Sequence, residues 1–322
     1  MHSFPAPIPY PKTYVCLRAD RPIELSGRVD GPEWEHAPWT DYFLDIQGES
    51  LPIPRFKTRA KMLWDDERLY IAAHMQEPYV WGTLREHDSV IFHDNDFEVF
   101  VDPDGDGHLY AEMEMNVLNT TWDLLLVKPY RAGGPPVNGW EMHGMRTAVN
   151  VDGACYHPSD PSHGWSVNIS IPWTVFAEIS RTPCPPKDGD HWRINFSRVE
   201  WQIEVVNGEY QKLPNHPEDN WVWSPQHVID MHWPERWGIL QFSGSHMMPV
   251  EVRDCPGVRE KMLLGQVWEA QSAFRREHGR WAATTSELHV PEGVEIQATS
   301  ELFEASYQGY CVDHSLRFWK QR

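Results

Sequence analysis

Two short segments of the chain carry acidic side chains at alternate positions. Glu98 lies between apolar neighbours, and Glu112, Glu114 and Asn116 follow one another at intervals of two residues. In an extended strand, residues two apart face the same side of a sheet. If the two strands are neighbours, their side chains could accept hydrogen bonds from hydroxyl groups, bind a cation or act as an acid/base pair, and Trp122 could extend the group. A solvated sheet face is the alternative interpretation.

A second acidic motif occupies residues 102–107, which read Asp-Pro-Asp-Gly-Asp-Gly. Its carboxylates stand at positions one, three and five and its glycine at position six, as in a calcium-binding loop. The motif predicts a structural Ca²⁺ held by Asp102, Asp104 and Asp106. Position twelve is Met113, where the complete calcium loop has a bidentate glutamate. An ordinary turn between two strands is therefore the competing interpretation, and no organic cofactor is expected.

Both acidic segments lie in a region that is predicted to form strands. From Tyr14 to about Ser243, short runs alternate apolar and polar residues. The alternation is clear in residues 69–76, 97–101, 112–117, 165–171 and 192–197. Clusters of Gly, Pro, Asp and Asn separate these runs, and no helical pattern lies between them. The sequence therefore predicts a mainly β fold over residues 1–245, an antiparallel β-sandwich of the jelly-roll type.

The pattern changes after residue 245. Apolar residues recur at helical spacing from Pro256 to His278, and Gly279 is suited to end a helix. Strand patterns follow at residues 294–298, 303–308 and 316–319. Residues 246–322 are therefore predicted to form a small C-terminal α+β appendage, which could cap a sheet edge or cover a binding face.

Charge and composition narrow the class of partner. The chain has 322 residues and a formal net charge of −19, which argues against nucleic acid and anionic membranes. No apolar run approaches the roughly 20 residues of a membrane span, and residues 1–14 do not resemble a signal peptide, so we expect a cytoplasmic protein. The five cysteines form no CxxC pair and are expected to be free thiols. Seventeen tryptophans could fill a core or stack on sugar rings.

Four stretches of the chain share their order and spacing with a known family. They are residues 23–34, residues 60–73, residues 96–116, which begin Asp-Phe-Glu-Val-Phe-Val-Asp, and residues 233–240, which read Trp-Pro-Glu-Arg-Trp-Gly-Ile-Leu. Together they resemble the family 9 carbohydrate-binding modules and the wider group of DOMON-like sandwiches. The resemblance implies the same β-sandwich fold, and it implies the structural calcium that the family often contains.

The resemblance also implies a site in which a sugar lies between two aromatic rings, with charged and amide side chains reaching its hydroxyls. The matching positions are Phe92 and Trp233 for the rings, and Glu98 and Asn116 for the polar groups. Glu114 departs from the family pattern, which has an arginine there, so the resemblance leaves open whether this chain binds the family's usual ligand, the reducing end of a glucan or xylan. We predict non-catalytic binding of a mono- or oligosaccharide in an aromatic-lined acidic cleft.

Two other functions stay open at this point. The carboxylates could hydrolyse a glycosidic bond or eliminate from a uronic acid, with His93, His108 or His143 as the base. Some DOMON-like relatives bind haem through methionine and histidine. Met113 and Met115 alternate with the glutamates, however, and are expected to face the core.

Overall fold

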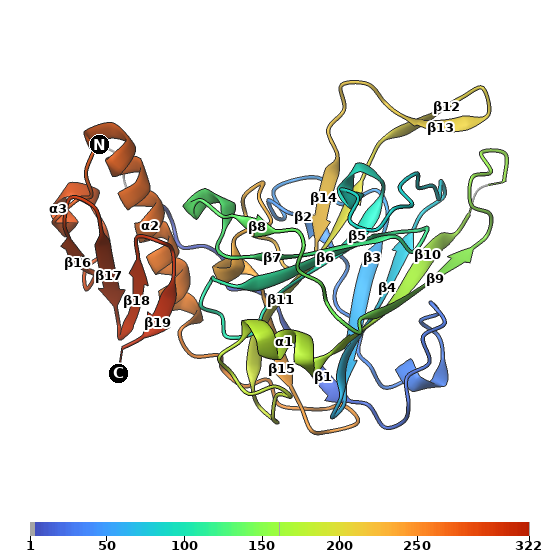
Figure 1. Ribbon diagram of the computed structural model, residues 1–322, viewed down its shortest axis with the longest axis horizontal. Helices are drawn as coiled ribbons and strands as arrows, with labels where there is room; N and C mark the ends of the chain where they lie inside the picture. Colours follow the sequence, from blue (N-terminus) through green and yellow to red (C-terminus); the bar gives the residue numbers. More distant parts are fainter. Residues whose placement is uncertain (1–3, 161, 322) are drawn as a thin grey trace.

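The computed structural model describes residues 4–160 and 162–321, and its main part consists of two curled β-sheets that share strand β1 (Figure 1). The first sheet has the order β8-β7-β6-β5-β11-β15-β1, with β14 beside β11 and β2 beside β14. The second has the order β1-β3-β4-β10-β9. The strands are β1 (Thr13–Arg18), β2 (Leu44–Asp45), β3 (Thr58–Trp64), β4 (Arg68–Gln76), β5 (Asp96–Asp102), β6 (Tyr110–Asn116), β7 (Thr121–Leu126), β8 (Pro136–Val137), β9 (Arg146–Asp152), β10 (Gly164–Pro172), β11 (His191–Glu200), β14 (Asp219–Val222) and β15 (Gly238–Phe242).

Strand β1 passes from one sheet to the other. Its residues 13–16 pair with β15, and Leu17 and Arg18 pair with β3. Both pairings are parallel, whereas the other strand pairs of these sheets are antiparallel. The predicted mainly β sandwich is confirmed, and β1 is the exception to its antiparallel character. Alternation along a strand does not reveal the direction of its neighbour, so this exception could not be predicted from local pattern.

The core lies between the two sheets. Val99 of β5 and Met113 of β6 belong to the same buried cluster as Ile71 of β4 and Ile169 of β10. Burying an apolar side chain of this size stabilises the fold by about 1.5–3 kcal/mol relative to leaving it exposed. Most tryptophans are buried, and six of them, Trp64, Trp165, Trp173, Trp192, Trp221 and Trp223, fill this core. The tryptophan content therefore reflects packing more than ligand binding.

Shorter elements complete the sandwich and shape its rim. A short helix, α1 (Trp173–Ile179), follows β10, and a separate hairpin is formed by β12 (Ile203–Val206) and β13 (Glu209–Lys212). Four 3₁₀ turns are η1 (Pro32–Trp34), η2 (Ile91–His93), η3 (Tyr130–Ala132) and η4 (Pro234–Arg236). All five cysteines are free thiols, as predicted.

The C-terminal part has its own small core beside the sandwich (Figure 1). Helix α2 (Val258–His278) packs Leu264 and Val267 against a four-stranded antiparallel sheet. Gly279 follows the helix with φ 72°, a left-handed conformation that glycine adopts without a Cβ clash, and this confirms the predicted helix end. The remaining elements are α3 (Thr285–Leu288), β16 (Glu295–Ala298), β17 (Phe303–Tyr307), β18 (Tyr310–Asp313) and β19 (Phe318–Lys320).

The boundary between sandwich and appendage, predicted at residue 245, is crossed by contacts. Phe4 packs against the appendage core, and the Gln266 side-chain amide donates a hydrogen bond to the Ala6 carbonyl at 3.0 Å. The N-terminal segment therefore supports α2. Among the described residues, no helix is long and apolar enough to span a membrane.

A buried ion cluster ties one sheet to the other. Arg198 of β11 is fully buried, and its Nη2 lies 2.7 Å from carboxylate oxygens of both Glu77 and Glu200. Its Nη1 donates hydrogen bonds to Thr58 Oγ1 and the Gln76 carbonyl, both at 3.0 Å. Because Thr58 and Gln76 belong to the second sheet, one guanidinium bridges both layers of the sandwich.

Candidate carbohydrate-binding cleft

Paired residues form rows across the outer face of the first sheet. Glu98 pairs with Glu114 across β5 and β6, and Glu114 pairs with Trp122 across β6 and β7. In the next row, Phe100 pairs with Glu112. The alternate residues of β5 and β6 point into the core. The three glutamates therefore share the opposite face, as their two-residue spacing predicts.

These side chains form part of a cleft of about 280 Å³. Its other lining residues come from segments that are distant in sequence, including η2, η3, the loop before η4, and β11 and β14. The cleft combines aromatic rings with carboxyl groups: its aromatic residues are Phe92, Phe100, Trp122 and Tyr130, and its acidic residues are Glu98, Glu112, Glu114, Glu218 and Asp230.

Burial shifts the acidity of the cleft glutamates. It raises the pKa of Glu98 to about 7, and the charge of Glu218 adds to the shift. Burial also raises the pKa values of Glu112 and Glu114 well above the ordinary value, and the neighbouring charge of Glu98 raises them further. Part of the cluster is therefore protonated near neutral pH. A protonated carboxyl group donates a hydrogen bond as well as accepting one, which suits a ligand rich in hydroxyls.

Two carboxylate oxygens of this cluster have no hydrogen-bond partner among the described residues. They are Asp96 Oδ2 and Glu112 Oε2, and both are buried. Carboxylate oxygens of Asp96, Glu98 and Glu114 also lie within 4.8 Å of one another, close enough to share a cation. Unpaired buried acceptors are costly, and Glu112 Oε2, the one of the two that belongs to a residue lining the cleft, would be stabilised by a donor from outside the protein.

Phe92 is held at the rim of the cleft by backbone hydrogen bonds. Its N–H donates to Glu114 Oε2 at 2.9 Å, and its carbonyl accepts from the indole N–H of Trp201 at 2.9 Å. Glu114 therefore contributes a carboxyl group to the cleft and fixes the turn that carries the ring. Phe92, Glu98 and Glu114 are the predicted ligand-binding residues that the structure brings together.

The other two predicted ligand-binding residues do not line the cleft. The Asn116 side chain is fully buried; its Nδ2 donates to the Leu84 carbonyl and to Asp94 Oδ2, both at 2.9 Å, and its Oδ1 accepts from two backbone N–H groups. Trp233 lies between the guanidinium groups of Arg131 and Arg236, each 3.8 Å from its ring centroid. Asn116 thus shapes a loop, and the faces of Trp233 are already covered by cations.

Trp233 is linked to the cleft through one lining residue, Asp230. Its indole N–H donates a 3.0 Å hydrogen bond to Asp230 Oδ2, and Asp230 lines the cleft. Trp122 and Tyr130 supply rings at the cleft instead of Trp233. The sequence pointed to Trp122 through its position after the glutamates, but Tyr130 and its neighbour His232 lie on loops with no motif that marks them.

None of the histidines proposed as bases lines this cleft. His108 Nε2 lies 2.9 Å from the Ser315 carbonyl, at the junction with the appendage, and His93 and His143 are exposed. His232 does line the cleft, and burial lowers its pKa to about 4. Met113 and Met115 pack in the core between the sheets, as expected. Neither methionine can therefore bind a haem in the cleft.

The acidic loop predicted to hold calcium receives basic side chains from the appendage. Both oxygens of Asp102 accept backbone N–H groups within the loop, from Gly105 and Gly107, each at 2.9 Å. Arg317 pairs with Asp106 at 2.8 Å, and the Lys261 ammonium donates to the Gly105 carbonyl at 2.6 Å. The loop thus has internal counter-charges, and calcium at Asp102, Asp104 and Asp106 stays a prediction.

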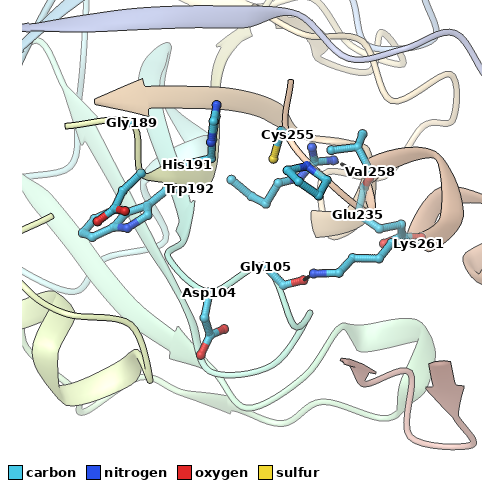
Figure 2. Close-up of a pocket in the computed structure, with 12 residues that line it drawn as sticks. Asp104, Gly105, Gly189, His191, Trp192, Glu235, Cys255, Val258 and Lys261 are labelled. Carbon is cyan, nitrogen blue, oxygen red and sulfur yellow. Dashed lines mark hydrogen bonds between the residues drawn. The ribbon is translucent and has the colours of Figure 1, made fainter. Parts of the chain in front are cut away.

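A second cavity, of about 290 Å³, lies between the sandwich and the start of α2 (Figure 2). Lys261 and Arg193 reach it, but their hydrogen bonds go to protein carbonyls, including those of Gly105 and Pro234. Its only aromatic ring among the described lining residues belongs to Trp192, which is 2% exposed. The cavity therefore offers no open ring for a sugar, and the carboxylate cleft is the better candidate.

A β-sandwich with a small aromatic and acidic cleft on one sheet belongs to the general class of ligand-binding modules. Residues 25–177 match the family described as carbohydrate family 9 binding domain-like. The chain is therefore a β-sandwich protein in which residues 25–177 are similar to the family 9 carbohydrate-binding modules, and the match supports carbohydrate binding as its class of function.

One solved structure supports this fold, and a second is reported for comparison. A proposed carbohydrate-binding protein from Bacteroides uniformis shares 17% sequence identity; the alignment covers 72% of this chain and 100% of that chain, with a TM-score of 0.52. A family 9 carbohydrate-binding module from Caldicellulosiruptor kristjanssonii, solved with cellotriose, shares 16% identity over 75% of this chain and 100% of that chain, with a TM-score of 0.44. The comparison with curated proteins gave no match.

Proposed function

We propose that the protein binds a neutral carbohydrate in the cleft on the outer face of β5, β6 and β7, without transforming it. The observation that carries this proposal is the meeting of rings and carboxyl groups in one cleft of about 280 Å³. Aromatic faces pack against the apolar faces of sugar rings. Carboxyl groups in mixed protonation states accept from sugar hydroxyls and donate to them.

The charge of the cleft favours neutral sugars over acidic ones. No lysine or arginine is among its described lining residues. Its histidine, His232, is neutral at pH 7 because burial lowers its pKa to about 4. A uronic acid or sugar phosphate would bring a negative charge beside Glu98, Glu112 and Glu114 with no cation to balance it, which costs binding energy.

Phe92→Ala should weaken the binding of the cleft's sugar at least ten-fold, because it removes an aromatic face while leaving the carboxyl groups in place. The measurement is isothermal titration calorimetry with glucose, cellotriose and xylotriose, with glucuronic acid as the charged comparison. We expect at least one neutral sugar to bind and glucuronic acid to bind more weakly.

Tyr42→Ala is the matched control, since Tyr42 is a 46% exposed ring that does not line the cleft. Its affinity should equal that of the unchanged protein. Equal affinities for Phe92→Ala and Tyr42→Ala would place the sugar elsewhere. The absence of binding across a wider neutral glycan panel would contradict the proposal.

A second function, glycoside cleavage, is favoured by one observation. Glu98 has a pKa of about 7 and stands opposite Glu114 on the next strand. A general acid with a pKa near the working pH, beside a second carboxyl group, is the arrangement that glycosidases use. The same cleft could therefore donate a proton to a glycosidic oxygen.

Glu98→Gln separates the two functions. If the protein is a glycosidase, this change should lower turnover by roughly 100-fold or more, because glutamine cannot transfer the proton. The measurement is product analysis after prolonged incubation with glucan and xylan oligosaccharides. New reducing ends from the unchanged protein, absent with Glu98→Gln, would replace the binding proposal by the catalytic one.

A further inference from the structure

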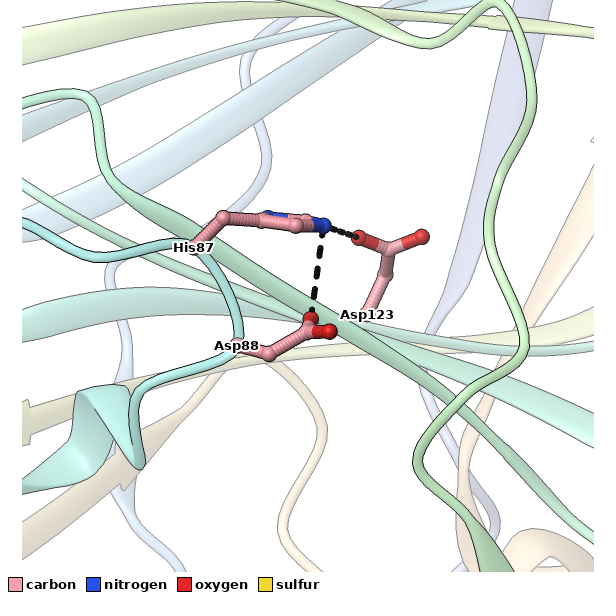
Figure 3. A group of neighbouring side chains, drawn as sticks. All are labelled: His87, Asp88 and Asp123. Atoms are coloured by element: carbon pink, nitrogen blue, oxygen red, sulfur yellow. Dashed lines mark ion pairs between the residues drawn. The ribbon is translucent and has the colours of Figure 1, made fainter.

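His87 and the carboxylates of Asp88 and Asp123 meet at the start of β7, away from the cleft (Figure 3), and the Glu141 carboxylate also reaches the His87 ring. His87 Nε2 lies 3.1 Å from Glu141 Oε2, 3.4 Å from Asp88 Oδ1 and 3.9 Å from Asp123 Oδ1. Asp123 alternates on β7 with Trp122 and therefore faces the other side of the sheet from the cleft. The group is thus a separate feature of the molecule.

The hydrogen bonds of the His87 ring fix its tautomer. Nδ1 lies 2.9 Å from the Thr121 carbonyl oxygen, which can only accept, so Nδ1 carries the proton. In the neutral ring, Nε2 then presents a lone pair to carboxylate oxygens, which are also acceptors. Such an arrangement needs a positive charge between the ring and the carboxylates, supplied either by a proton on Nε2, which then donates to Glu141, or by a bound cation. An orienting carbonyl bond on the far nitrogen is usual for metal-binding histidines.

Asp123 supplies a second, independent indication. Its side chain is 1% exposed, and its Oδ2 accepts a hydrogen bond from the Met142 N–H. Its Oδ1 is buried and has no hydrogen-bond partner among the residues that the structure describes, and it points toward His87 Nε2, as Figure 3 shows. A buried carboxylate oxygen without a donor is costly, and a bound cation would satisfy it.

We propose that His87, Asp88, Asp123 and Glu141 bind one divalent transition metal ion, represented by Zn²⁺. One imidazole nitrogen with carboxylate oxygens is a ligand set that Zn²⁺ accepts in tetrahedral sites. Ca²⁺ prefers six to eight oxygen ligands and does not favour nitrogen. The ion would join the loop before η2 and the segment before β9 to strand β7.

The test is calorimetric titration of the full chain, treated with chelator, with ZnCl₂, and melting curves with and without the metal. The unchanged protein should bind Zn²⁺ and melt at a higher temperature when it is present. Asp123→Asn, which keeps an oxygen for the Met142 N–H, and His87→Gln should each weaken this binding at least ten-fold. Glu141→Gln removes one carboxylate from the proposed site. Because the Glu141 side chain is 37% exposed, this change does not disturb buried packing.

His163→Gln is the control for adventitious binding. His163 is an exposed histidine 3.5 Å from one carboxylate, that of Asp152. Its Zn²⁺ titration should match that of the unchanged protein. The proposal is overturned if no Zn²⁺ binds, or if His87→Gln titrates like His163→Gln. A CaCl₂ titration that Asp123→Asn weakens and His87→Gln does not would also overturn it, because the site would then use oxygen ligands alone.

Discussion

Arg198→Ala should lower the free energy of unfolding by about 3–5 kcal/mol, which is a large share of the stability of an ordinary domain. Arg198 is fully buried and is the cation for both Glu77 and Glu200, which are buried as well. Removing it leaves Glu77 without this counter-charge and Glu200 with only the more distant Arg55, 3.7 Å away, and it also deprives Thr58 Oγ1 and the Gln76 carbonyl of a donor. Urea denaturation followed by circular dichroism would measure the loss.

The exposed ion pair between Arg28 and Asp30 provides the comparison. Their nitrogen and oxygen lie 2.7 Å apart, but the side chains are 60% and 67% exposed. Such pairs contribute about 0–1 kcal/mol, so Arg28→Ala should be nearly neutral. An Arg198→Ala variant as stable as Arg28→Ala would show that the buried cluster relaxes to admit water or protonates at little cost.

Glu98→Gln should remove part of the pH dependence of stability between pH 4.5 and 7. The folded pKa of Glu98 is about 7, above its ordinary value of 4.5, because of burial. Below pH 4.5 the carboxyl group is protonated in both states and causes no penalty. As the pH rises to about 7, the unfolded chain loses the proton more readily, so stability falls by roughly 2–3 kcal/mol from this group. Glutamine has no proton to lose.

Unfolding curves of both proteins at pH 5 and pH 7.5 test this prediction. Comparing the two proteins at each pH is necessary because other groups titrate as well. His232 acts in the opposite direction: its lowered pKa of about 4 makes stability rise with pH between about 4 and 6.5. Glu98→Gln should gain stability relative to the unchanged protein as the pH rises. A constant difference between the two proteins across this range would mean that Glu98 ionises normally.

The part of the cleft that lies on strands was predictable from sequence. Two-residue alternation is a local property, and it placed Glu98 and Glu114 together on the face opposite Val99 and Met113. The part that lies on loops was not predictable. The guanidinium groups of Arg131 and Arg236 both lie over the Trp233 ring. Arg131 precedes Trp233 by about a hundred residues, so no local pattern in the sequence indicates that it contacts this ring.

In the appendage, too, the element with a clear local sequence pattern was predicted, and an element defined only by its pairing was not. The helix at residues 258–278 and its glycine stop follow from spacing within the helix. Strand β18 was missed: Tyr310–Asp313 is only four residues long, and three of its four residues are buried, so it has no two-residue alternation. Its pairing with β17 and β19 defines it, and pairing partners lie outside any local window.

The contacts of the acidic loop have a consequence for work on fragments. Arg317 forms an ion pair with Asp106, and the Lys261 ammonium donates a hydrogen bond to the Gly105 carbonyl. Both basic residues belong to the C-terminal appendage. A fragment that ends near residue 245 would keep Asp102, Asp104 and Asp106, whose oxygens lie within 4.8 Å of one another, and would lose these cations. A calcium affinity measured on that fragment would therefore not carry over to the intact chain, in which Arg317 and Lys261 place positive charge beside the same carboxylates.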